Sequence, residues 1–251
     1  MRLKDYHVHS VFSDGADTPE QIVLTAIEKG MTEIGFSDHS YISYPCDIVY
    51  WLNKESEPVY KAEISRLKEK YKDKIKILCG IEQDYYSDHN ACGYDYIIGS
   101  VHFIKTDSVL IAVDHDEEYL LDNLRHFDGD IYLFAEKYYK LVENVVTKTK
   151  CDIIGHFDLV SKYNERSFLF DENHPRYITA WKTAADKLIK TGKPFEINTG
   201  AIARGIKKHP YPSMEIIRYI KNKGGKFILS SDAHSKENLC YNFEKIINLQ
   251  K

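Results

Sequence analysis

Near its beginning the chain reads Asp5-Tyr6-His7-Val8-His9-Ser10, which places two histidines one residue apart at the end of a short predicted β-strand, residues 4–9. In a β-strand, the side chains of residues i and i+2 point to the same side. His7 and His9 can therefore direct two imidazole rings at one point. This is a simple way to hold a metal ion, and the rest of the chain supplies residues that could complete such a site.

Six further predicted strands share one pattern: each is apolar along most of its length and leads into His, Glu, Asp or Asn. These strands cover residues 33–37, 76–82, 96–102, 152–156, 194–198 and 226–232. Short apolar runs bounded by polar residues are typical of strands that are buried in a parallel sheet. The polar residue that follows each run is therefore expected at the carboxyl end of a strand.

Helical patterns lie between these strands, and the first of them has the clearest boundaries. Thr18 is a good N-cap, Pro19 suits the first helical position, and Gln21 completes a capping box. Gly30 ends this helix. Further helices are predicted over residues 58–72, 117–127, 131–149, 175–191, 213–222 and 236–248, and residues 41–57 are expected to form a long loop.

About seven strand–helix units follow one another in the 251 residues, with no linker or change of composition between them. This succession predicts a single α/β domain over residues 1–251, built as a parallel barrel. An open, doubly wound sheet is the alternative. In an α/β barrel the carboxyl ends of the strands form the active-site face, and the polar residues fall at those ends.

The composition narrows the possible partners. Hydrophobic residues make up 43% of the chain and the formal net charge is −4, which argues against a protein that binds nucleic acid through an overall basic field. No run of 18 apolar residues is present, so no membrane partner is expected. The five cysteines are scattered and form no CxxC pair. Together with the lack of an apolar leader before His7, this predicts a cytoplasmic protein with reduced thiols.

The polar residues at the strand ends form one set of six histidines and three carboxylates. They are His7, His9, Asp14, His39, Glu82, His102, His156, Asp232 and His234. Neutral imidazole and carboxylate are the usual ligands of Zn, Mn and Fe. Taken singly, each residue has an ordinary structural explanation; Asp14, for example, could be a turn residue beside Gly15. Because six of the eleven histidines fall on one predicted face, we interpret the set as a centre for two to three divalent metal ions.

These residues, in this order, resemble the PHP superfamily, the polymerase and histidinol phosphatase family. The motifs that match are His7-x-His9, Asp14, Ser37-Asp38-His39, Gly80-Ile81-Glu82, Gly99-Ser100-Val101-His102, Gly155-His156 and Ser231-Asp232-Ala233-His234. Residues 5–10, 99–102, 155–160 and 196–200 further resemble the bacterial PHP-type histidinol-phosphate phosphatases. The resemblance implies a distorted (β/α)7 barrel, similar to a TIM barrel, with the metal site at the C-terminal ends of the strands.

The resemblance also implies a division of the ligands among three ions. One ion would be held by His7, His9, Glu82 and Asp232; Glu82 would bridge to a second, held also by His102 and His156; the third would be held by Asp14, His39 and His234. A catalytic role is expected for His7, His9, Glu82, Asp232 and His234. Arg166 and Arg204, in loops after predicted strands, are expected to bind the substrate, because guanidinium groups bind phosphate in a bidentate manner.

The expected reaction is hydrolysis of L-histidinol phosphate to L-histidinol and phosphate, a step of histidine biosynthesis. Three divalent ions and three carboxylates leave a net charge of about +3, which attracts a phosphate ester, and a metal-bridging hydroxide would attack phosphorus. Two alternatives remain open at this point. The chain could act on another phosphate ester, such as phosphotyrosine or a nucleotide or oligonucleotide, or it could be a metal-binding module without turnover. Loss of ligands would mark such a module, and no ligand position is lost.

Overall fold

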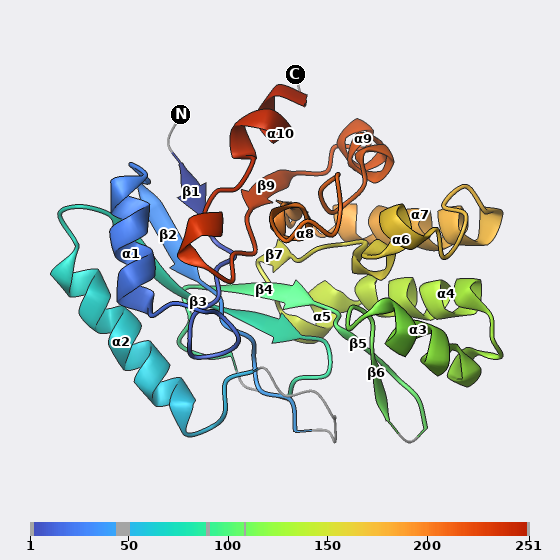
Figure 1. The fold of residues 1–251 in the computed structure, drawn as a ribbon, viewed down its shortest axis with the longest axis horizontal. Coiled ribbons are helices and arrows are strands. Elements are labelled where there is room, and N and C mark those ends of the chain that lie inside the picture. Colours follow the sequence, from blue (N-terminus) through green and yellow to red (C-terminus); the bar gives the residue numbers. More distant parts are fainter. Residues whose placement is uncertain (1–2, 44–50, 89–90, 108, 250–251) are drawn as a thin grey trace.

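The computed structural model describes residues 3–43, 51–88, 91–107 and 109–249, and its centre is a seven-stranded parallel sheet (Figure 1). In spatial order the strands are β1 (Lys4–Asp5), β2 (Glu33–Phe36), β3 (Lys76–Asp84), β4 (Tyr96–Ser100), β7 (Ile153–Ile154), β8 (Phe195–Asn198) and β9 (Phe227–Ser230). Val8 forms a parallel bridge with Ala233, which brings the first and last strands together. The sheet is therefore a nearly closed barrel, as predicted.

The order of the strands excludes the open, doubly wound alternative. Neighbours in the sheet succeed one another in the chain, apart from one inserted hairpin, whereas a doubly wound sheet reverses its order at a switch point. β1 is shorter than predicted, and His7 and His9 lie just beyond it. Their rings nevertheless lie side by side, with centroids 5.1 Å apart, because the bridge at Val8 keeps this segment extended alongside residue 233.

The helices surround the sheet (Figure 1). The main ones are α1 (Pro19–Glu28), α2 (Ser56–Lys70), α3 (Glu117–Asn123), α4 (Ile131–Val142), α5 (Val145–Thr149), α7 (Pro175–Ile189), α9 (Met214–Asn222) and α10 (Phe243–Leu249), with shorter turns at α6 (Asn164–Ser167), α8 (Gly200–Ala203), η1 (Leu124–Phe127), η2 (Leu159–Ser161) and η3 (Lys236–Asn238). The predicted capping box of α1 is confirmed, because the Gln21 N–H donates to Thr18 Oγ1 and the Thr18 N–H donates to the side chain of Gln21.

Two predicted helices are interrupted in the structure. The helix predicted over 131–149 divides into α4 and α5, and the Asn144 side chain donates to the Lys140 carbonyl oxygen at 2.9 Å, a local bond that competes with a continuous helix. The helix predicted over 236–248 contains Cys240 and Asn242, which have φ angles of 56° and 58°. Left-handed backbone cannot continue a right-handed helix, so α10 begins only at Phe243.

A short hairpin of strands β5 (Phe103–Lys105) and β6 (Leu110–Ala112) was not predicted. It interrupts the strand–helix alternation directly after β4, and Figure 1 shows it extending away from the barrel. Three residues per strand are too few for periodicity to reveal. The hairpin has a consequence for the site, because the chain that leaves β6 returns to the mouth of the barrel. Residue 108, and residues 44–50 of the predicted loop 41–57, lie outside the described residues.

Tyr96 fills the interior of the barrel beneath the site. A Cβ atom on Gly35 would lie 2.3 Å from the Tyr96 hydroxyl, and one on Gly80 would lie 2.3 Å from its ring. The absence of side chains at these two positions makes room for the ring. The Tyr96 hydroxyl lies 2.6 Å from the carbonyl oxygen of Tyr6, next to the first of the predicted ligand histidines. The packing of this one ring therefore supports the segment that carries His7.

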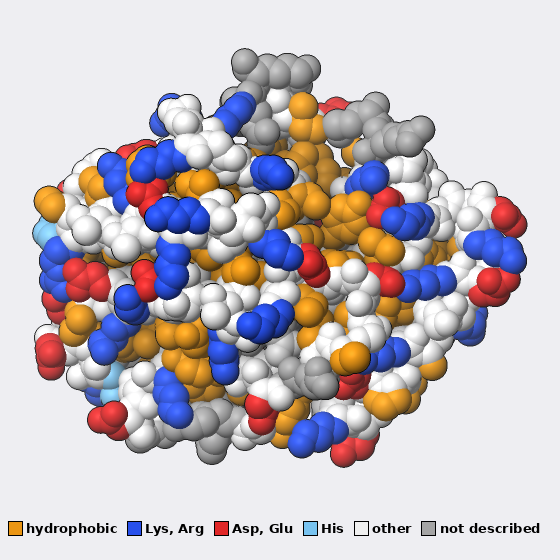
Figure 2. All heavy atoms as spheres, turned by 180° about the vertical axis from the view of Figure 1, so that it is seen from behind, with side chains coloured by type: hydrophobic (Ala, Val, Ile, Leu, Met, Phe, Trp, Pro, Cys, Tyr) orange, Lys and Arg blue, Asp and Glu red, His pale blue; other side chains and the backbone are white. Residues whose placement is uncertain are grey.

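No helix among the described residues is long and apolar enough to cross a membrane. Figure 2 shows the molecule from behind, where Lys and Arg side chains alternate with acidic and neutral ones over the visible face. That face carries no continuous basic stripe among its described residues, and this agrees with the net charge of −4.

Candidate metal centre

The carboxyl ends of the strands meet around a cavity of about 300 Å³. It is lined by Asp14, His39, Glu82, Ala112, Asp114, His102, His115, His156, Leu159, Lys162, Arg204, Asp232 and His234. His7 and His9, which are fully buried, contact this set from below. All nine predicted metal ligands are thus brought together at one site, although they are spread over more than 220 positions of the sequence.

The first ligand group combines the histidine pair with two carboxylates. His7 Nε2 and His9 Nε2 lie 3.2 Å and 3.6 Å from Glu82 Oε2. The same two nitrogens lie 3.7 Å and 3.3 Å from Asp232 Oδ1. Ligand atoms around a tetrahedral ion with bonds of about 2.1 Å are separated by about 3.4 Å. These four atoms therefore have the spacing of a coordination shell.

The second ligand group forms around the other oxygen of Glu82. His156 Nε2 lies 2.9 Å and His102 Nε2 lies 3.3 Å from Glu82 Oε1. The two nitrogens lie 3.2 Å from each other. Because Glu82 directs one oxygen to each group, it has the geometry of a carboxylate that bridges two ions.

The third ligand group lies nearest to solvent. Asp14 Oδ2 is 3.1 Å from His234 Nε2, and Asp14 Oδ1 is 3.7 Å from His39 Nε2 and 3.6 Å from His9 Nδ1. His9 thus contacts this group as well as the first. The His39 ring turns its other nitrogen, Nδ1, to Glu82 Oε2 at 2.9 Å. The structure therefore links the third group to the first more closely than the predicted division of ligands implies.

Several buried polar atoms in these groups have no hydrogen-bond partner. Both ring nitrogens of His9, as well as His7 Nε2 and Glu82 Oε2, are among them. Leaving such atoms unsatisfied costs free energy unless something binds them. Burial, with His234 and His39 nearby, lowers the pKa of His9 to about 3, so its imidazole is neutral and can act as a ligand. The residues present therefore fit two to three divalent ions.

The backbone at Asp232 is held in an unusual conformation. Its φ angle is +48°, in the left-handed region that non-glycine residues seldom occupy. A Cβ atom on Gly200 would come within 2.8 Å of Asp232 Oδ2, so glycine at position 200 leaves room for this carboxylate. In this conformation Asp232 Oδ1 lies 3.7 Å from His7 Nε2 and 3.3 Å from His9 Nε2.

The two predicted arginines occupy different places. Arg204 lines the cavity, and its Nη2 lies 3.3 Å from Asp232 Oδ2 while its Nη1 lies 3.0 Å from His234 Nδ1. The side chain of Arg166 is 71% exposed and its nearest acidic partner is Glu117, at 3.6 Å. Arg166 belongs to the short helix α6 and is not among the residues that line the cavity. The structure thus brings Arg204, but not Arg166, to the metal centre.

Several cavity-lining residues were not singled out from the sequence, among them Lys162 and Asp114. Lys162, six residues after His156, donates to Asp114 Oδ2 at 3.0 Å and to the Asp114 carbonyl oxygen at 2.6 Å. Burial of Asp114 opposes ionisation of its carboxyl group, but the positive charge of Lys162 helps to lower the pKa of Asp114 to about 2. Asp114 follows the unpredicted hairpin, so no strand end pointed to it. Lys162 is the basic residue that the structure presents where Arg166 was expected.

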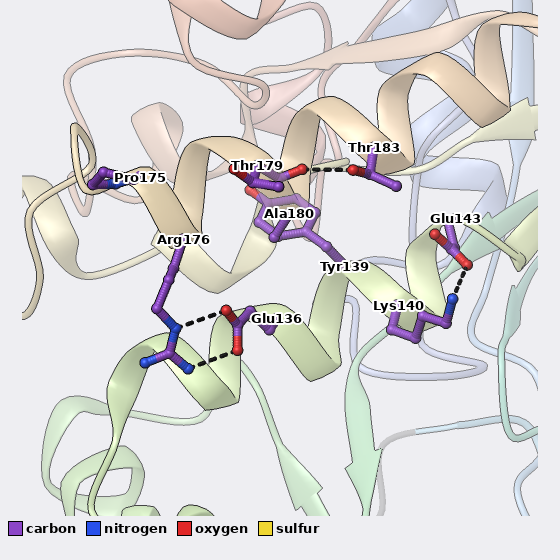
Figure 3. A pocket seen from close by; sticks show the side chains of 9 residues that line it. All are labelled: Glu136, Tyr139, Lys140, Glu143, Pro175, Arg176, Thr179, Ala180 and Thr183. Atoms are coloured by element: carbon purple, nitrogen blue, oxygen red, sulfur yellow. Dashed lines mark hydrogen bonds and ion pairs between the residues drawn. The ribbon is translucent and has the colours of Figure 1, made fainter.

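A second cavity, of about 380 Å³, lies on the outer surface between α4 and α7 (Figure 3). Its polar side chains already pair with one another: Arg176 donates to both carboxylate oxygens of Glu136 at 2.7 Å, and Lys140 pairs with Glu143 at 2.7 Å. Its lining residues, among those the structure describes, belong to α4, the residue that follows α4, and α7, and none is part of a strand. The larger of the two cavities therefore lacks the unsatisfied ligands that distinguish the barrel mouth.

Comparison with known proteins gives a consistent result. Residues 5–200 match the model of the PHP domain. A histidinol-phosphatase of Lactococcus lactis is 32% identical, over 93% of this chain and 85% of its own, and one of Bacillus subtilis is 25% identical, over 98% and 99%.

Solved structures agree in fold. A protein of Listeria monocytogenes superposes with a TM-score of 0.84 at 18% identity, over 97% of this chain and 99% of its own. The histidinol phosphate phosphatase of Lactococcus lactis, solved with zinc, L-histidinol and phosphate, superposes with a TM-score of 0.74 at 25% identity, over 98% and 92%. The chain therefore belongs to the PHP domain family and is homologous to the bacterial histidinol-phosphatases over nearly its full length.

Proposed function

We propose that this protein is a metal-dependent phosphatase that hydrolyses L-histidinol phosphate to L-histidinol and phosphate. The observation that carries the proposal is the convergence of nine imidazole and carboxylate side chains around one cavity, with several buried ligand atoms left unsatisfied. The full-length similarity to histidinol-phosphatases supports the substrate. The relative from Lactococcus lactis that was solved with zinc, L-histidinol and phosphate supports the metal and the ligand class.

The three ligand groups would hold the ions, and the neighbouring residues would bind the ester. Divalent ions supply Lewis acidity, which lowers the pKa of coordinated water and neutralises charge on phosphate oxygens. Arg204 would orient the phosphate, since its guanidinium lies between Asp232 and His234 at the edge of the metal centre. Lys162 lines the same cavity and would add a second positive charge.

Asp114 would recognise the amino alcohol part of the substrate. It is the only carboxylate lining the cavity, among the described residues, that does not belong to the predicted metal ligands. It is ionised at neutral pH, because its pKa is lowered to about 2. Histidinol phosphate carries an ammonium group, which a carboxylate binds through charge-assisted hydrogen bonds. A phosphate ester without a cationic group would gain nothing from Asp114.

A panel of phosphate esters tests the proposed substrate. The purified protein, supplied with Mn or Zn, should hydrolyse histidinol phosphate with a kcat/KM at least about tenfold above that for an N-acetylated phosphotyrosine peptide without lysine or for a nucleoside monophosphate, the scale of one charged hydrogen bond. The measurement is release of inorganic phosphate. A clear preference for the phosphotyrosine peptide or the nucleotide would show that the proposed substrate is wrong, although the protein would still be a phosphatase.

The same panel run on Asp114→Asn locates the source of the preference. We expect this variant to lose activity toward histidinol phosphate selectively and to keep its activity toward the esters without an ammonium group. Asp107→Asn, an exposed residue near the turn of the β5–β6 hairpin, is the matched control. An equal loss toward every ester would assign Asp114 to the metal centre or to stability instead.

The remaining expectations complete the proposal. Residues from both ends of the chain, such as His7 and His234, contribute to one cavity, which supports a single functional unit over residues 1–251. A small phosphate ester is the proposed partner, and neither a membrane nor a nucleic acid is needed. The cytoplasmic localisation stays a prediction.

A further inference from the structure

One more buried carboxylate lies beside the metal centre and belongs to none of its ligand groups. Glu196, in the middle of β8, is 0% exposed. Its Oε1 lies 2.7 Å from His7 Nδ1, and its Oε2 accepts the His156 N–H at 2.9 Å. Both of its oxygens are therefore engaged by residues of the first and second ligand groups.

The contact with His7 joins two segments that are not neighbours in the sheet. In the sheet, β9 lies between β8 and the segment of β1 that carries His7. Glu196 and His7 are also 189 positions apart in the sequence. Neither neighbouring strands nor local sequence require this contact, so it is a feature of the site and not of the sheet.

The charge of Glu196 has no basic partner among the described residues, because no Lys or Arg side chain forms an ion pair with it there. A buried, unpaired carboxylate is costly to maintain. The ring that faces its Oε1 is the imidazole of His7, with Nδ1 at 2.7 Å. A positive charge on the far side of that imidazole would compensate the carboxylate.

We propose that Glu196 is a positioning residue for the metal centre; the inference rests on the proposed metal-dependent function. By accepting a proton from His7 Nδ1, it places the lone pair of this ring on Nε2, the atom that faces Glu82 and Asp232 and has no hydrogen-bond partner. A carboxylate in this position orients a ligand histidine and increases its basicity. Through the His156 N–H, the same carboxylate sets the spacing between two ligand groups.

Asp84 offers a weaker parallel on the other side of the site. Its Oδ2 lies 3.2 Å from His102 Nδ1 and accepts the His102 N–H at 3.0 Å. Asp84 is on β3, the strand next to β4 from which His102 follows, so this pair is held within one pair of strands. Glu196 has the shorter contact and joins two ligand groups. We therefore expect the larger effect on metal binding at Glu196.

The test measures metal binding without turnover. Zinc is titrated into metal-free wild type and Glu196→Gln in competition with a chromophoric chelator. Gln has the shape of Glu but no charge, and its amide group cannot accept hydrogen bonds at both ends. We expect the Kd of at least one zinc ion to rise about tenfold or more. This is the usual loss of affinity when a carboxylate that hydrogen-bonds a ligand histidine is removed. The visible spectrum of the cobalt-substituted protein should change as well.

Two further variants separate positioning from folding. Glu33→Gln is the matched control, because Glu33 is also a nearly buried strand carboxylate but pairs with Lys4 and Lys76, and it is not in the cavity. It should leave the zinc Kd and the cobalt spectrum unchanged. Glu196→Asp keeps the charge and should recover part of the affinity that Glu196→Gln loses.

The outcomes distinguish this inference from the proposed function. Wild type that binds no zinc would overturn the metal-dependent function itself. Wild type that binds zinc while Glu196→Gln binds it with the same Kd and the same cobalt spectrum would overturn the inference alone. If Glu196→Gln does not fold, equal zinc Kd values for Glu196→Asp and wild type would also overturn it. Metal-free Glu196→Gln should unfold at a temperature no lower than metal-free wild type, since it buries no unpaired charge.

Discussion

The Glu82→Ala variant is expected to release phosphate from histidinol phosphate at less than about a thousandth of the wild-type rate, because the Lewis acidity that activates water is lost with the bridging carboxylate. Glu82 contributes to two ligand groups at once. Its Oε1 lies 2.9 Å from His156 Nε2, and its Oε2 lies 3.2 Å from His7 Nε2. Removing it would leave the imidazoles of both groups without the negative charge that is proposed to hold two ions close together.

The measurement is kcat for phosphate release with saturating Mn or Zn, together with circular dichroism to show that the fold persists. Glu69→Ala is the control, since the side chain of Glu69 is 76% exposed and pairs only with Lys72 among the described residues. It should retain wild-type activity. If Glu82→Ala is folded and keeps a tenth or more of the wild-type kcat, Glu82 is not part of the catalytic centre.

The Arg204→Ala variant is expected to lower kcat/KM for histidinol phosphate by about 10- to 100-fold, the equivalent of a charged hydrogen bond of about 1.5–3 kcal/mol. Arg204 is a partly exposed guanidinium, at 31%, that reaches from α8 to Asp232 and His234. Its free N–H groups are available to an anion in the cavity. Because Arg204 would contact the phosphate, which every ester carries, Arg204→Ala should lower kcat/KM for all the esters. Asp114→Asn, in contrast, should lower it only for the ester with an ammonium group.

Arg166→Ala provides the matched control, because it removes the same side chain from the exposed helix α6. We expect its kcat/KM to stay within about twofold of wild type, the range of an exposed ion pair. An equal loss of kcat/KM in Arg204→Ala and Arg166→Ala would show that Arg166 also binds the substrate. A loss in Arg166→Ala alone would show that the phosphate enters from the side of Glu117, and would contradict the orientation proposed here.

The position of the candidate metal ligands was predictable because each strand repeats one chemical pattern. An apolar run that leads into His, Glu or Asp places that residue at the mouth of a parallel barrel, whatever the precise ends of the strand are. β1 illustrates this: it ends at Asp5, yet the predicted ligands His7 and His9 still lie at the site, because the chain stays extended to the bridge at Val8.

The residues that escaped prediction depend on contacts that are distant in sequence. Asp114 reaches the cavity through a hairpin too short to be recognised, and Lys162 through a turn after β7 whose direction no local pattern specifies. The sequence did contain a signal for Glu196, because it is a charged residue inside a predicted buried strand. The partner that explains it, His7, lies at the other end of the chain and only the closed barrel brings the two together.

Arg166 shows the limit of predicting a site from loop position. It follows His156 by ten residues, as a substrate-binding arginine could, but the chain first forms η2 and α6. These two turns present Lys162 to the cavity and Arg166 to solvent. The number of residues after a candidate ligand therefore identifies the loop. The local turns determine which basic residue of that loop lines the cavity.

The most direct test of the metal centre is the metal content of the purified protein, measured by elemental mass spectrometry and expressed as ions per chain. The ligand groups predict two to three ions of Zn, Mn or Fe per chain, and their removal by a chelator should abolish phosphate release until metal is restored. A protein that hydrolyses histidinol phosphate at full rate with less than one ion per chain, and is unaffected by the chelator, would contradict the account.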